Sequence, residues 1–220
     1  MSTPAELLIP WLTGAICGLL VSVPVGPINV TIVNEGAQRG FRWAFLIGLG
    51  SVAMEVLYCA AAFTGFSELF NSREIKATME LISFLLVPFL GFKYLLAQTL
   101  PGTPKSAARI EQRLHPHTAF MTGFVRVLAN PLVLLFWITL SATMIAHEWV
   151  DTTWASKGTY VAGVAAGALA WFVLLSFIAS RGHGKFSAQT LLRMSKISGA
   201  ILLLVACGIG YRLVALLARR

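Results

Sequence analysis

The residues of this sequence that could do chemistry are a few polar side chains inside long apolar stretches. Glu55 lies midway along one stretch, and Arg126 lies near the start of another. A carboxyl group surrounded by hydrocarbon is most easily buried in its protonated form, so Glu55 could carry a proton in exchange for a substrate. Arg126 could bind a carboxylate or pair with Glu55. The alternatives are a purely structural ion pair and extension of Arg126 to the lipid head groups.

Two of the apolar stretches are interrupted by proline, each with an asparagine beside it: Pro24, Gly26 and Pro27 with Asn29, and Pro131 with Asn130. Proline has no backbone N–H and disfavours helix at the preceding residue. In hydrocarbon, the freed backbone groups must face protein or a water-filled cavity. Half-helix ends then direct amides toward a carboxylate and carbonyls toward a cation. A simple proline kink is the alternative.

These residues together predict a substrate-binding site made from both breaks. Arg126 lies roughly 10 Å inside its stretch at 1.5 Å per residue, and Pro27 lies at a similar depth from the same face. The predicted binding residues are the six residues of the two breaks and Arg126, with Glu55 as the coupling residue.

The elements that must position these residues follow from composition. Of 220 residues, 57% are hydrophobic and only 12% are charged, and the mean hydropathy is +0.77. A helix that crosses the lipid bilayer needs about 20 apolar residues. Six stretches have that length: Leu7–Val33, Arg42–Phe66, Met79–Gln98, Phe120–Ala146, Gly158–Ser180 and Met194–Leu217. We therefore predict an all-α membrane protein with six transmembrane helices in a single domain, 1–220.

The longest polar connector divides the chain into two halves of three spans. Half one covers about 1–98, the linker 99–118 and half two about 119–220. Because each half crosses the membrane an odd number of times, related halves would form a 3+3 inverted repeat. The breaks then fall in the first and fourth helices, at corresponding places. Paired interruptions of this kind are typical of transporter sites.

Charge predicts the orientation of the chain. The net charge is +8, but Lys and Arg lie mainly in short connectors and helix ends, where lipid head groups account for them, so no nucleic-acid partner is expected. The more basic side has Arg39, Arg42, Lys93, Lys105, Arg109, Arg113, Arg181, Lys185, Arg193 and Lys196; the other side has Arg73, Lys76, Lys157, Arg212, Arg219 and Arg220. The positive-inside rule places both termini outside the cytoplasm, on the periplasmic side of a bacterial inner membrane.

Other chemistry has little support in the sequence. Cys17, Cys59 and Cys207 are dispersed and are read as small buried side chains. The histidines His115, His117, His147 and His183 lie in connectors or at span ends. Neither a catalytic triad nor a zinc helix can be assembled from them, so we expect no metal, no cofactor and no enzymatic activity.

Two local features concern packing. Gly14-x-x-x-Gly18 and Gly163-x-x-x-Gly167 have the spacing that allows two helices to approach closely. Asn34-Glu35 follows the first apolar stretch, and we expect these residues to cap the end of the first span.

Several motifs resemble the signatures of a known family. Val23-Pro24-Val25-Gly26-Pro27, Asn34-Glu35-Gly36, Arg39-Gly40-Phe41-Arg42 and the glycines 48 and 50 resemble the N-terminal signature of the LysE/RhtB amino-acid exporters. Gly123-Phe124 and Asn130-Pro131 resemble that family's second motif. The resemblance covers essentially the whole chain. It implies export of an amino acid or similar metabolite from the bacterial cytoplasm, driven by an ion gradient.

Two positions depart from the family pattern. The leading proline of the family's Pro-Gly-Pro is displaced by one residue, at Pro24, and Glu55 stands where the family usually has aspartate.

The leading hypothesis is a proton-coupled secondary exporter that works by alternating access. A membrane thiol-redox protein and a divalent-metal exporter are the alternatives. The sequence leaves open which amino-acid-like substrate and coupling ion are used, and whether the protein is a homo-oligomer.

Overall fold

The fold of the chain comes from a computed structural model, which describes residues 4–24, 26–65, 73–99, 109–110, 113–114, 118–146, 149–181 and 188–218. The described residues form helices and connecting segments, with no strand among them. The helices are α1 (Pro4–Ser22), α2 (Pro27–Arg39), α3 (Phe41–Gly65), α4 (Arg73–Leu95), α6 (Ala119–Leu128), α7 (Pro131–Ala146), α8 (Trp154–Arg181) and α9 (Ala188–Ala218). The predicted all-α class is therefore confirmed. The four histidines and Lys105, Lys185, Arg219 and Arg220 lie outside the described residues.

Up to four membrane spans can be assigned within the described parts of the chain. Phe41–Thr64 and Trp154–Arg181 are each long and apolar enough to cross a membrane alone. Two bent helix pairs meet the same criterion jointly: α1 with α2, bent by 75°, and α6 with α7, bent by 68°. Both predicted breaks are thus confirmed. α4 and α9 cover the predicted third and sixth spans as helices, and their crossing of the membrane stays a prediction.

The end of the first span differs from the prediction. Asn34 and Glu35 do not cap a helix, because α2 continues to Arg39 and ends at Gly40, which has a φ of 83°. Glu35 pairs with Arg39 one turn later, with 3.2 Å between Oε2 and Nε. The ion pair at this spacing stabilises the last turn of the helix, and Gly40 can adopt the left-handed backbone that ends it.

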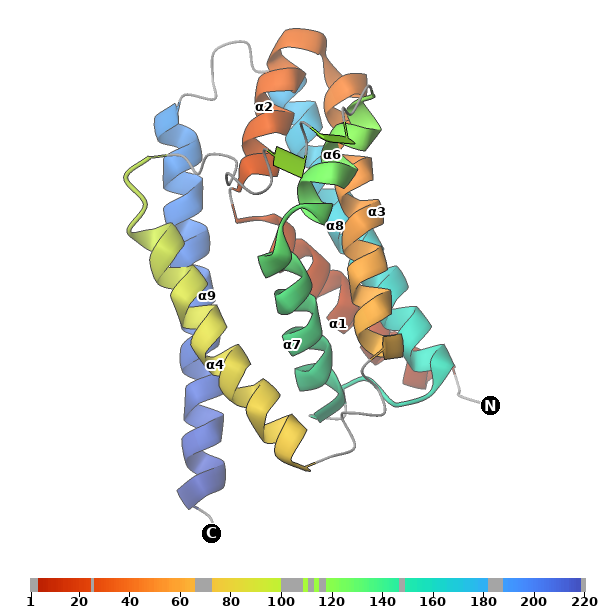
Figure 1. Cartoon of the computed structure of the whole chain (residues 1–220), viewed down its shortest axis with the longest axis vertical. Helices are drawn as coiled ribbons and strands as arrows, with labels where there is room; N and C mark the ends of the chain where they lie inside the picture. The colour runs from red at the N-terminus through yellow and green to blue at the C-terminus, as the bar shows by residue number, and fades with distance from the viewer. Residues whose placement is uncertain are drawn as a thin grey trace.

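α3 and α8 pack against each other on one side of the molecule, α4 and α9 lie on the other side, and α7 lies between them (Figure 1). α1 packs along α8, α6 packs along α3, and α2 lies against both α3 and α8. α7 contacts α3 and α4, and α4 pairs with α9. Both termini lie at the same end of the molecule, opposite the α2–α3 turn (Figure 1). We call the end with the termini the terminal end.

The contact between α1 and α8 depends on small residues. A Cβ atom on Gly14 or Gly18 would overlap the backbone of Tyr160 or Val164, and one on Gly163 or Gly167 would overlap the backbone of α1. The predicted packing role of both small-residue motifs is therefore confirmed.

An equivalent close approach joins α3 and α6. A Cβ atom on Gly50 would overlap the Phe120 carbonyl oxygen, and one on Gly123 would overlap the Ile47 carbonyl oxygen. α6 begins with a side-chain cap, in which Thr118 Oγ1 accepts a hydrogen bond from Met121 N at 3.2 Å. The short helix before the second break is therefore held tightly against the centre of α3.

Candidate functional site

The first break leaves backbone groups without helical partners. At the end of α1, Val23 N donates a hydrogen bond to Leu19 O at 3.0 Å. At the start of α2, Val30 N donates one to Gly26 O at 3.2 Å. Pro27 has no N–H to donate to Val23 O. Gly26, the N-cap of α2, makes no side-chain cap. The first amides of α2 therefore lie at the break without a capping side chain, in the arrangement that favours an anion.

Asn29 bridges this break from inside. Its Nδ2 donates to Ser22 O at 3.0 Å and to Pro24 O at 2.7 Å, and its Oδ1 accepts a bond from Trp171 Nε1 at 3.1 Å. Only 3% of Asn29 is exposed. Both amide hydrogens are thus used on carbonyls that the break releases, and the break is tied to α8. A single lone pair of Oδ1 remains for any other partner.

The second break is bridged from a different helix. Ala129 N donates to Val125 O at 2.9 Å and Asn130 N to Val127 O at 3.0 Å, and the chain then turns into α7. Leu128 O accepts a hydrogen bond of 2.9 Å from the Tyr58 hydroxyl of α3. Asn130 is partly buried beside this turn. Each break therefore has a polar side chain that donates to its backbone carbonyls: Asn29 to Ser22 O and Pro24 O in the first, and Tyr58 to Leu128 O in the second.

Arg126 connects the two broken helices. Its Nη1 donates to Thr31 Oγ1, which in turn donates to Pro27 O at 2.8 Å. Arg126 belongs to α6, just before the second break, and Thr31 belongs to α2, just after the first. Arg126 therefore reaches the first turn of α2 beside Pro27, and the depth of both residues in the membrane stays a prediction. This contact places a cation between the two short half-helices.

Glu55 lies in the interior of the helix bundle. It is 7% exposed, and its Oε2 has no hydrogen-bond partner among the described residues. The Ser22 side chain, at the end of α1, lies beside the carboxyl group. Ser22 Oγ donates to Gly18 O at 2.8 Å. Glu55 therefore lies close to the first break, and its predicted pairing with Arg126 stays a prediction.

Four residues of this region were missed by sequence reasoning: Ser22, Thr31, Tyr58 and Trp171. Thr31 could have been found, because it lies one turn after Pro27, where its hydroxyl can reach the Pro27 carbonyl. Tyr58 and Trp171 act over 70 and 142 residues of sequence. No local pattern indicates such distant partners.

The cysteines are divided between the interior and the surface. Cys59 is buried, Cys17 is half-buried, and Cys207 is exposed on α9, all as free thiols. Cys17 and Cys59 belong to the same cluster of packed side chains, to which α1, α3, α7 and α8 contribute. Within the parts of the chain that the structure describes, no three His, Cys, Asp or Glu side chains come together to hold a metal.

Comparison with known proteins adds to this geometry. The family model described as "LysE type translocator" matches residues 19–213, which include both breaks, Glu55 and Arg126. The chain belongs to the LysE type translocator family. No solved structure was found to match it.

Two curated relatives are similar to this LysE-type chain. One is the "Putative amino acid efflux protein YcgF" of Bacillus subtilis (strain 168), 26% identical over 202 residues, covering 92% of this chain and 95% of the relative. The other is the "Chemotactic transduction protein ChpE" of Pseudomonas aeruginosa, 22% identical over 161 residues, covering 73% of this chain and 77% of the relative. The family match, the apolar helices and the similarity to the Bacillus protein point to a membrane transporter of a small molecule rather than an enzyme.

Proposed function

We propose that this protein exports amino acids or closely related small metabolites across the bacterial inner membrane, coupled to protons, by alternating access at a site between the two broken helices. The observation that carries this proposal is the contact of Arg126 with Thr31, because it brings a cation to the junction of both broken helices. The family membership and the amino acid efflux named for the Bacillus relative support the substrate class.

The substrate carboxylate would bind between Arg126 and the first amides of α2. A guanidinium group can make two parallel hydrogen bonds to a carboxylate, and a helix N-terminus favours an anion. Binding would compete with the hydrogen bond to Thr31, so the substrate would change the link between α6 and α2. This gives a physical reason why occupancy could favour a rearrangement of the breaks.

The remaining predicted residues would shape the site. Pro24, Gly26 and Pro27 keep the first break open, and Pro131 does the same for the second. Asn130 would offer its amide to the substrate. Asn29 would offer the lone pair of Oδ1 that its protein partners leave, while its main task is to hold the break.

Glu55 would carry the coupling proton. The single proton of the Ser22 hydroxyl is already donated to Gly18 O. With the hydroxyl proton on Gly18 O, a protonated Glu55 would donate a hydrogen bond to Ser22 Oγ. Loss of that proton would remove the bond at the end of α1, next to the first break.

An inverted repeat would explain several of the helix contacts. If α1, α2, α3 and α4 correspond to α6, α7, α8 and α9, the contact of α1 with α8 corresponds to that of α6 with α3. Both of these contacts depend on glycines against backbone. The contacts of α3 with α8 and of α4 with α9 each join two corresponding helices, so they stay the same when the halves are exchanged. This pattern supports a 3+3 arrangement of six spans.

An efflux screen tests the proposal. Cells that contain or lack the protein are loaded with dipeptides, and the release of each amino acid is measured. We expect at least one amino acid to leave faster with the protein present, and Glu55→Gln to abolish the stimulation by a proton gradient while the protein inserts normally.

The outcomes separate the two parts of the proposal. If no amino acid or related metabolite leaves faster, the export function is wrong. If Glu55→Gln exports at the wild-type rate, Glu55 has no part in the mechanism, although the export function stands. Glu35→Gln is the matched control, because this carboxylate pairs with Arg39 near the end of α2.

A further inference from the structure

A line of buried polar groups extends from Glu55 toward the terminal end, and the exporter mechanism above uses only Glu55 among them. Its members come from four helices. Cys17 lies on α1, Glu55 and Cys59 on α3, Ser141 on α7 and Tyr160 on α8. Cys59 is one turn beyond Glu55 along α3, and the Phe63 ring one turn further contacts the Tyr160 ring edge-on at 5.4 Å. We call these five residues the polar line.

The members of the polar line are neighbours in space. The Ser141 side chain lies beside the Cys59 thiol, and the Tyr160 hydroxyl lies beside the Cys17 thiol. Cys59 is also close enough to Cys17 and to Glu55 to interact with them electrostatically. Cys59, Tyr160 and Cys17 belong to one cluster of packed side chains.

Several of these groups lack a hydrogen-bond partner. Glu55 Oε2, Ser141 Oγ and Tyr160 Oη are buried and unpaired among the described residues. Ser141 and Tyr160 have no exposed surface at all. An unpaired buried polar group is unfavourable, and native proteins satisfy such groups with protein partners or ordered water. Three such polar atoms lie along one line, next to thiols that can also form hydrogen bonds. This arrangement indicates that the same kind of partner satisfies all of them.

The polar line has an end near the surface. Ser156 lies one turn before Tyr160 on α8, and its Oγ accepts a hydrogen bond of 3.0 Å from the backbone N–H of Asp151. Asp151 is exposed. Trp154 at the start of α8 is also exposed, and its ring lies 5.2 Å from Lys157 Nζ, as is common where a helix meets the membrane surface.

We propose that water molecules bound along the polar line connect Glu55 with the terminal end of the bundle and carry protons between them. This inference rests on the proposed coupling role of Glu55. Each transfer breaks one O–H or S–H bond and forms another along an existing hydrogen bond, and no oxidant or further reactant takes part. Beyond Tyr160 lies the buried Ser156, which is hydrogen-bonded to the exposed Asp151, so the path would open beside Asp151.

Hydrogen–deuterium exchange of the Glu55 carboxyl group tests this path without any substrate. Purified protein in lipid vesicles is transferred to D₂O near neutral pD, and the carboxyl C=O band is followed by infrared spectroscopy. Glu55→Gln identifies the band by removing it. We expect the wild-type band to shift at a rate that rapid mixing resolves, while Tyr160→Phe and Ser141→Ala each slow the shift by about five- to tenfold, as the loss of one hydrogen bond in the path predicts.

Ser176→Ala is the matched control. Ser176 is also a completely buried serine with an unpaired Oγ, and it lies on α8 sixteen residues beyond Tyr160, away from the terminal end. We expect its exchange rate to equal that of the wild type. A slowing in Ser176→Ala without one in Tyr160→Phe would overturn the proposal, because the path would then lead to the opposite end.

The wild-type protein alone can also overturn the proposal, even if a variant fails to fold. If the Glu55 carboxyl band stayed unshifted in D₂O for hours, no water path would reach it. If no band disappeared in Glu55→Gln, Glu55 would hold no proton. Neither result would affect the export function, which the efflux screen tests separately.

Discussion

At the scale of single residues, the first break depends on Asn29 more than on its prolines. Prolines remove helical hydrogen bonds, but Asn29 supplies the replacements for Ser22 O and Pro24 O and holds Trp171. A break in a membrane helix persists only where its backbone groups find partners. The sequence predicts Asn29 as a substrate-binding residue, whereas its hydrogen bonds in the structure link α1, α2 and α8.

Asn29→Ala should destabilise the protein. The substitution leaves two carbonyls and one indole N–H unpaired in the interior, at a cost of about 2 kcal/mol or more. We expect the midpoint of thermal unfolding in detergent to fall by roughly 4–8 °C. Asn34→Ala, on the exposed face of the same helix, should leave the midpoint unchanged. An equal midpoint for Asn29→Ala and the wild type would contradict the bridging role.

Arg126 provides the corresponding test of substrate binding. Arg126→Gln removes the guanidinium group between the half-helices, and we expect kcat/KM for the exported amino acid to fall roughly ten- to hundredfold, the value of a hydrogen bond to a charged group. Arg42→Gln, at the exposed start of α3, should have little effect. If Arg126→Gln exported amino acids and analogues without the carboxylate charge as fast as the wild type does, Arg126 would not bind the carboxylate.

At the scale of helices, the predictions that succeeded had local causes. The breaks follow from the missing N–H of proline, and the spans follow from apolar length. The predicted stretch 42–66 differs by one residue at each end from α3, Phe41–Gly65. The prediction for Asn34-Glu35 was wrong because α2 continues past them to Arg39 and ends at Gly40, which has a positive φ. Partners such as Tyr58 for Leu128 depend on how distant helices meet, which no local pattern contains.

The tight crossing of α1 and α8 gives a prediction at this scale. Gly167→Ala introduces a Cβ atom that overlaps the Ala15 carbonyl oxygen, so the two helices must move apart. Overpacking of this kind costs about 1–3 kcal/mol. We expect a lower unfolding midpoint in detergent and a loss of export. Gly158→Ala lies on the same helix with nothing within 4 Å of the new Cβ, and it should be neutral or slightly stabilising. Equal midpoints for both variants would contradict a close crossing.

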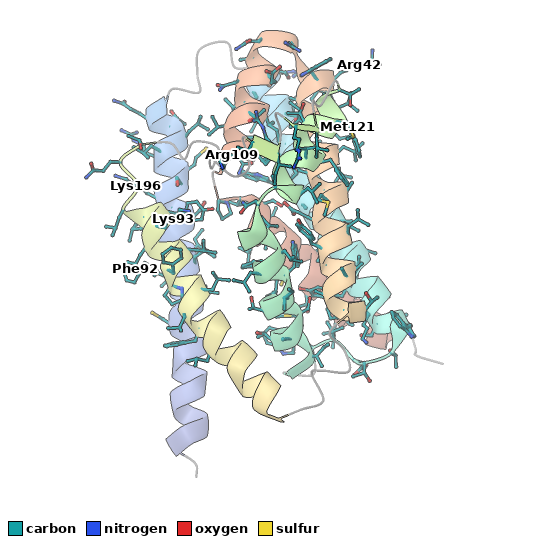
Figure 2. All side chains as sticks on the ribbon, in the orientation of Figure 1. Arg42, Phe92, Lys93, Arg109, Met121 and Lys196 are labelled. Carbon is teal, nitrogen blue, oxygen red and sulfur yellow. The ribbon has the colours of Figure 1, made fainter. Side chains whose placement is uncertain are left out.

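At the scale of the whole molecule, the basic side chains gather away from the termini. Arg42, Arg109 and Lys196 lie in the half of the molecule opposite the terminal end (Figure 2). Two arginines contact aromatic rings: Arg39 lies 4.8 Å from the Trp43 ring centre, and Arg181 lies 4.2 Å from that of Phe177. Such pairs are favourable at a membrane surface, where the ring is half in lipid and the charge is in water.

This distribution predicts the orientation of the protein. The positive-inside rule places the end with Arg39, Arg42 and Arg181 in the cytoplasm and the terminal end outside. Alkaline phosphatase fused after Arg220 should therefore be active, whereas a fluorescent protein fused there should be dark. Fusions after Leu114, in the connector between α4 and α6, should behave in the opposite way. With this orientation, the end of the polar line beside Asp151 would face the outside of the cell, from which protons would enter during export. Fluorescence at the C-terminal fusion would reverse the orientation, and with it the direction in which Glu55 receives its proton.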